Sequence, residues 1–171
     1  MASLIEVLIH TLERENTEYG VLYELSSAKT PVIIKGDLIN LEKITMAEQE
    51  VVATIQKLEK DRIQTMKEIS GIMGVKGEIT LPELIEKMGS RVKERDALAK
   101  VHDELKQTLA GMVKVNDQNR ELLKNSLEMV EFEMSLLQMM KKAPETADYT
   151  RNAYAAGNTM GSGTKRFDSK Q

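Results

Sequence analysis

Residues 98–137 read LAKVHDELKQTLAGMVKVNDQNRELLKNSLEMVEFEMSLL, and the spacing of their apolar side chains decides the fold. Apolar or seam positions follow one another at steps of three or four residues: Leu98, Val101, Leu105, Leu109, Met112, Asn116, Asn119, Leu123, Leu127, Val130, Met134 and Leu137. Such steps place side chains on one face of an α-helix, and Glu, Lys, Asp and Arg occupy the other face. The stretch therefore predicts one amphipathic helix over 90–142 that packs along a seam.

The length of this helix has a consequence for its packing. A helix of about fifty residues is roughly 75 Å long at 1.5 Å per residue. The two long helices that precede it in the sequence are shorter, so they cover only part of its apolar stripe. We expect residues 91–115 to pack against them. Residues 122–140 then have no partner within the chain, so we expect them to bind another protein.

The first predicted helix covers residues 3–27. It opens with a capping box, in which Ser3 and the glutamate three positions later satisfy each other's backbone N–H groups. Its apolar stripe is interrupted only by Glu15. Pro31 disfavours the helical region for the residue before it. We therefore predict a connector over 29–36 whose apolar residues fold back onto the helices.

The second predicted helix covers residues 38–73, with Asp37 as its N-cap. Glu48 and Arg62 fill the two steps at which its apolar stripe is interrupted. Repeated glycine disfavours a helix interior, so the helix is expected to end in a glycine cluster: Gly71, Gly74 and Gly77. A second capping box, of sequence Thr-Leu-Pro-Glu, then opens a short helix over 81–88.

The composition agrees with an all-α protein. Aromatic residues make up 4% of the chain and Trp is absent, whereas aliphatic residues and Met are abundant, as in helices packed along seams. We predict an elongated antiparallel helical bundle or coiled coil over 1–142, with three main helices and one short connecting helix. Residues 143–171 begin with Ala-Pro and are rich in small polar residues, which predicts a flexible C-terminal tail.

The sequence contains no group of residues typical of catalysis or of cofactor binding. The chain has no Cys, and its two histidines, His10 and His102, lack neighbours at metal-ligand spacing. The glycine cluster lacks the Lys-Ser/Thr of a phosphate-binding loop. We therefore expect no enzyme activity, no metal and no cofactor.

Charge and hydropathy exclude further classes of partner. The net charge is −3 with both signs mixed along the chain, which gives no basic footprint for nucleic acid. No apolar run reaches membrane-spanning length, and residues 1–10 lack the basic region of a signal peptide. The absence of Cys suits a reducing compartment, so we expect a cytoplasmic protein without membrane insertion.

Two features of the long helix leave alternatives open. Asn116 and Asn119 occupy consecutive seam positions, where a buried amide fixes register; a slight rotation of the helix would instead turn them to water. Methionine crowds the last turns of the helix, at Met129, Met134, Met139 and Met140. Such a group suits a surface that accepts partners of several shapes, and it is equally common as ordinary core filler.

As a set, these features resemble the FlgN family of flagellar type III export chaperones. The resemblance covers the whole chain and rests on the order of its features. The connector ends in Gly-Asp at residues 36–37, and the second helix contains LEKDR at 58–62. The long helix contains NDQNRELL at 116–123, and the tail has YAAG at 154–157 followed by basic residues.

The resemblance implies a role in flagellum biogenesis. Family members bind newly made hook-filament junction (hook-associated) proteins, prevent their premature assembly, and deliver them to the type III protein export gate without hydrolysing ATP themselves. The C-terminal helix of the chaperone engages the terminal segment of the client. In this chain that role falls to six partner-binding residues: Leu123, Leu127, Val130, Met134, Leu137 and Met140.

The resemblance also implies a tyrosine that docks to the platform protein of the export gate. Tyr154, followed by Gly157, is the nearest match in this tail. Its spacing departs from the family pattern by one residue and an adjacent Gly is missing, so Tyr149 is a rival.

The competing hypothesis is a structural coiled-coil protein that self-associates through the same helix. The exposed stripe would then be buried in a homodimer rather than on a client. A chaperone is also compatible with a weak homodimer, so the strength of self-association separates the two hypotheses.

Overall fold

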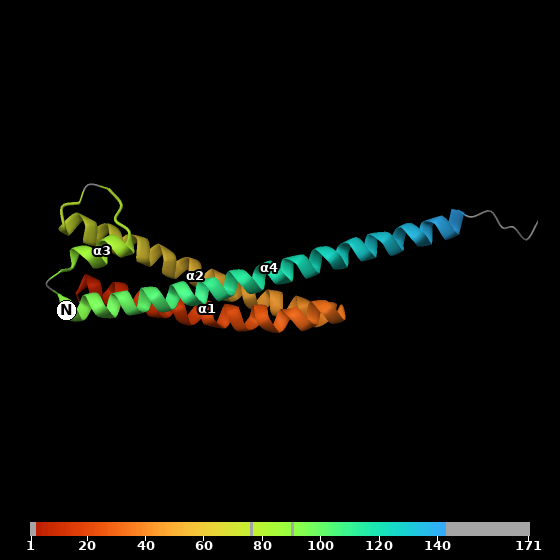
Figure 1. The fold of residues 1–171 in the computed structure, drawn as a ribbon, viewed down its shortest axis with the longest axis horizontal. Coiled ribbons are helices and arrows are strands. Elements are labelled where there is room, and N and C mark those ends of the chain that lie inside the picture. The colour runs from red at the N-terminus through yellow and green to blue at the C-terminus, as the bar shows by residue number, and fades with distance from the viewer. Residues whose placement is uncertain (1–2, 76, 90, 143–171) are drawn as a thin grey trace, which may run out of the picture. The chain divides into compact units, whose positions relative to one another are not determined.

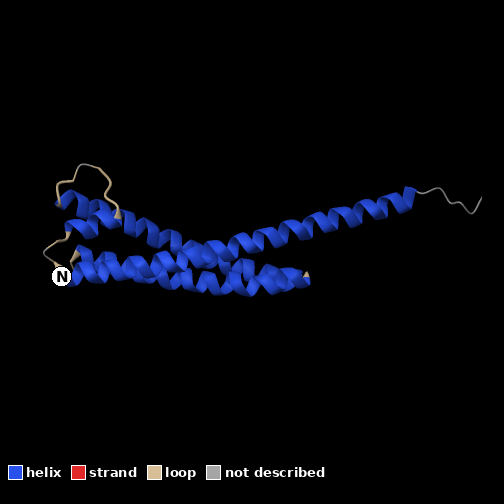
Figure 2. Ribbon diagram, in the orientation of Figure 1, coloured by secondary structure: helices blue, strands red, loops and turns tan. Residues whose placement is uncertain are grey.

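The computed structural model describes residues 3–75, 77–89 and 91–142, and the regular structure in these ranges is helical throughout (Figures 1 and 2). Its elements are α1 (Leu4–Lys35), α2 (Leu38–Ile72), α3 (Leu81–Lys87) and α4 (Val92–Lys142). The chain divides into two compact units, Met1–Leu127 and Glu128–Gln171. The tail predicted over 143–171 lies outside the described residues.

The spacing of apolar residues located the long helix correctly. α4 contains 51 residues and covers the range in which steps of three and four recur. The bounds of α2 and α3 each differ from the predicted ones by one residue at the C-terminal end. Both predicted capping boxes are formed, one by Ser3 with Glu6 and one by Thr80 with Glu83.

The predicted end of the first helix at residue 27 is wrong. α1 continues through Pro31 to Lys35, so the expected connector over 29–36 is instead the last two turns of this helix and its C-cap. Proline removes one backbone hydrogen bond from a helix. Packing outweighs that loss here, because Ile33 is buried at 5% exposure. The helix ends at Gly36, whose left-handed backbone (φ 66°) allows its N–H to donate to the Ile33 carbonyl.

Contacts between side chains give the directions of the helices in the first unit. Early residues of α1 meet late residues of α2, as in the pair Glu15 and Arg62, so these helices are antiparallel. α4 runs in the direction of α1, because Asn16 meets Thr108 and a later residue of α1, Thr30, meets Asn119. Figure 1 shows α1, α2 and the beginning of α4 side by side, with α3 beside the start of α4.

All four helices contribute to one apolar core near the start of α1. Leu8, Leu12, Leu84 and Leu98 have no exposed surface, and the core also includes further buried residues: Ile5, Met66, Ile69, Ile79, Met88, Val101 and Leu105. A second, smaller cluster comprises Leu22, Ile55 and Met112. The short helix α3 therefore closes one end of the first unit by burying Leu84 there.

Candidate functional site

Polar side chains interrupt the apolar seam of the first unit, and each finds a partner on another helix. Glu15 is 1% exposed, and Arg62 Nε donates to its Oε1 over 3.0 Å. Burial raises the pKa of Glu15, while the charge of Arg62 acts in the opposite direction. The Tyr19 hydroxyl donates to Glu59 over 3.0 Å; burial and this bond raise the pKa of Tyr19 to about 12. Two of the stripe interruptions seen in the sequence, Glu15 and Arg62, thus compensate each other.

The third interruption, Glu48, is also paired. Lys29 Nζ donates to Glu48 Oε2 over 2.6 Å, and the Ser26 hydroxyl donates to Glu48 Oε1 over 2.8 Å. Both charged side chains are largely shielded from water, with side-chain exposures of 17% and 14%. The charges therefore hold α1 and α2 in register at a second level of the seam.

The two seam asparagines, for which burial and exposure to water were both expected alternatives, differ in the structure. Asn119 is 4% exposed; its Nδ2 donates to the Ser26 carbonyl and its Oδ1 accepts from the Thr30 hydroxyl, each over 2.7 Å. Asn116, by contrast, is exposed. A buried amide with two partners on α1 permits one alignment of the helices, so Asn119 fixes the register of α4 on α1.

Burial on α4 ends shortly after Asn119. Leu122 and Leu123 are half-buried, and every residue from Lys124 to Lys141 is exposed. Of the predicted partner-binding residues that lie in the first unit, Leu123 is thus partly covered and Leu127 is 63% exposed. The last buried residue, Asn119, thus lies four residues beyond the expected limit at 115, and partial burial continues to Leu123.

The second unit carries a dense set of exposed apolar side chains on α4. Eight of the twelve residues over 129–140 are large, apolar and exposed: Met129, Val130, Phe132, Met134, Leu136, Leu137, Met139 and Met140. The remaining predicted partner-binding residues belong to this set. Contiguous exposed apolar surface of this kind marks an interaction site.

These side chains form two rows. Val130, Met134 and Leu137 follow one another at steps of four and three, and we name them the first row. Phe132, Leu136 and Met139 repeat the same steps two residues later, and they form the second row. Two residues turn an α-helix by about 200°, so the rows lie on nearly opposite faces. The single stripe expected from the sequence does not include Phe132, although the repeated spacing of the second row indicates it.

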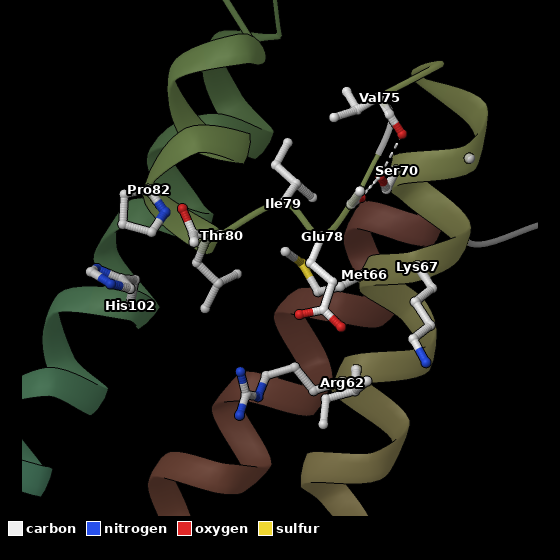
Figure 3. A pocket seen from close by; sticks show the side chains of 14 residues that line it. Arg62, Met66, Lys67, Ser70, Val75, Glu78, Ile79, Thr80, Pro82 and His102 are labelled. Carbon is white, nitrogen blue, oxygen red and sulfur yellow. Dashed lines mark hydrogen bonds between the residues drawn. The ribbon is translucent and has the colours of Figure 1, made fainter.

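An open cavity of about 630 Å³ lies in the first unit between α2, the segment before α3, and α4. In Figure 3, Pro82 and His102 stand on one side of it, and Lys67 and Ser70 stand on the other. The Ser70 hydroxyl lies within hydrogen-bond distance of the carbonyls of Val75 (3.3 Å) and Gly77 (2.9 Å), so it links the end of α2 to the segment before α3. Basic, acidic and apolar side chains all line the cavity, so the lining does not indicate one class of ligand.

Two further properties of the described residues bear on function. No group of three or more His, Cys, Asp or Glu side chains there is placed to hold a metal ion. Among the described helices, none is both long and apolar enough to cross a bilayer. The candidate docking residues Tyr154 and Tyr149 lie outside the described part of the chain.

Comparison with known proteins adds two findings. The family model described as "FlgN protein" matches residues 1–156. The "Uncharacterized protein YvyG" of Bacillus subtilis (strain 168) is 28% identical over 132 residues, which make up 77% of this chain and 79% of that protein. No solved structure gives a significant match.

Proposed function

This chain belongs to the FlgN family, the flagellar export chaperones, and from that premise we propose that its clients are hook-filament junction proteins. The chaperone binds them in the cytoplasm, prevents their early assembly and delivers them to the type III export gate. The finding that carries the proposal is the exposed apolar surface over 129–140, which has the character of a binding face.

Binding is proposed to follow a helix-on-helix mode. The six partner-binding residues are those of the C-terminal half of α4: Leu123, Leu127, Val130, Met134, Leu137 and Met140. They present anchors at helical spacing to an amphipathic helix at the end of the client. Methionine side chains within the surface adapt to clients of different shape.

The first unit is proposed to act as a stable platform, an antiparallel helical bundle built on α1, α2 and the first part of α4. Its polar pairs fix the register of the helices and so define which residues of α4 remain uncovered. A client segment that becomes helical only on binding loses conformational entropy. That loss limits affinity and favours release at the export gate.

The experiment that tests this function is a pull-down of a co-expressed junction protein with a row variant. Val130→Asp together with Met134→Asp places two charges in the first row, so co-purification should be lost while the helical circular dichroism signal stays unchanged. Gln138→Asp, on the polar side of the same segment, is the matched control and should bind normally. Undiminished binding by the double variant would refute the proposal.

The competing hypothesis, self-association through the same helix, is separated by light scattering of the purified chain. A constitutive dimer that does not dissociate when a junction protein is added would favour a structural coiled-coil protein. A monomer, or a weak dimer that a junction protein displaces, agrees with the chaperone proposal.

A further inference from the structure

The second apolar row is the feature that a single helical partner leaves unexplained. Helix-on-helix packing covers an apolar stripe a little over 100° wide. At 100° per residue the exposed apolar side chains over 129–140 span about 220° of the helix surface. A client helix seated on the first row would therefore leave Phe132, Leu136 and Met139 in water.

Four of the five polar residues over 128–140 occupy one narrow strip. Glu128, Glu131, Ser135 and Gln138 fall within about 80° of one another on a helical projection. Glu133 lies elsewhere, between the two rows. A helix whose polar residues lie mostly in one narrow strip is expected to bury most of its circumference against its partners.

The charged residues of this segment of α4 indicate which class of partner covers it. Residues 125–140 contain three glutamates and no Lys or Arg. In a parallel pair of α4 helices packed through the second row, Glu128 of one copy would lie across from Glu133 of the other, and like charges at a helix interface are unfavourable. A partner with Lys or Arg at the edges of its apolar stripe would instead pair with Glu128, Glu131 and Glu133.

We infer that both rows bind, and that their occupant is one client molecule that presents two amphipathic helices with basic edges, one on each row. This inference rests on the proposed function and deepens it. Helices packed at about 9–10 Å on the two rows lie roughly 18 Å apart, a gap that a connection of about six residues spans. Once the first helix is bound, the tethered second helix binds at a high effective concentration.

The absence of cysteine from the chain allows a direct test by thiol protection. Three single-cysteine variants are compared: Met134→Cys in the first row, Leu136→Cys in the second row, and Gln138→Cys in the polar strip as the control. Each is reacted with a maleimide, free and in complex with a co-expressed hook-filament junction protein whose own cysteines are replaced by serine. Complex formation is checked by size exclusion with light scattering.

The expected result is protection of the cysteines at 134 and 136 by about tenfold or more on complex formation, because thiol reactivity follows exposure. The cysteine at 138 should stay reactive, and the complex should contain one client per chaperone. Protection at 134 alone overturns this inference and leaves the proposed function standing. Two clients per chaperone, or protection at 136 in the free chain at rising concentration, also overturns it. If no complex forms with the wild-type chain, the proposed function fails as well.

Discussion

Arg62 Nε lies 3.0 Å from Glu15 Oε1, so the seam between α1 and α2 buries a carboxylate against a guanidinium. Removing one partner of such a pair leaves an uncompensated charge, at a cost of about 3 kcal/mol. Arg62→Met should therefore destabilise the chain by about that amount, as measured by urea unfolding. Adding Glu15→Leu should restore most of the loss, since an apolar pair of similar volume needs no compensation. Equal stability of the single and double variants would contradict this account.

The raised pKa of Glu15 predicts a dependence of stability on pH. When the pKa is higher in the folded state, folding binds a proton, and the free energy of unfolding falls as pH rises from the ordinary value of 4.5 through the raised value. Glu15→Gln removes this dependence. The variant should thus gain stability relative to the wild type as pH rises across that window. The measurement is urea unfolding of both proteins at several pH values, and a difference that does not change with pH would refute it.

Asn119 provides a test of register. Asn119→Ala leaves the Ser26 carbonyl and the Thr30 hydroxyl without their buried partner, which should cost about 1–3 kcal/mol in the free energy of unfolding. Asn116→Ala is the matched control, because Asn116 is exposed and its replacement should change stability by less than about 0.5 kcal/mol. Similar losses in the free energy of unfolding of the two variants would show that Asn119 does not fix the register of α4 on α1.

The sequence carried most of the information on α4 but not on the end of α1. Steps of three and four residues are a local signal, so the extent of α4 follows from them directly. The continuation of α1 past Pro31 depends on contacts from 89 residues away, such as the hydrogen bond between Thr30 and Asn119. The choice between Asn116 and Asn119 likewise needs the position of α1, which the spacing of seam residues does not contain.

Pro31 itself supplies a further prediction. It lies within α1 and is exposed, so Pro31→Ala restores a backbone N–H to the helix without disturbing the core. Proline costs about 3 kcal/mol more than alanine in a helix interior, and its stiffening of the unfolded chain returns up to about 1 kcal/mol. The variant should therefore have a higher Tm and a free energy of unfolding larger by about 2–3 kcal/mol. A lower Tm would contradict this prediction and would indicate that the proline ring stabilises the folded chain.

Tyr154 is the proposed contact with the export gate, and its test must separate docking from client binding. Tyr154→Ala should leave co-purification of a junction protein unchanged, because the proposed client surface lies on α4. Loss of an aromatic anchor costs about 2 kcal/mol, a roughly thirtyfold weaker affinity for the gate platform. Secretion of junction proteins into the medium, and with it motility, should fall accordingly. Tyr149→Ala is both the matched control and the test of the rival residue: a defect there with normal motility in Tyr154→Ala would move the docking role to Tyr149. Normal secretion in both variants would exclude either tyrosine as the docking contact, while the client surface on α4 would remain to be judged by its own variants.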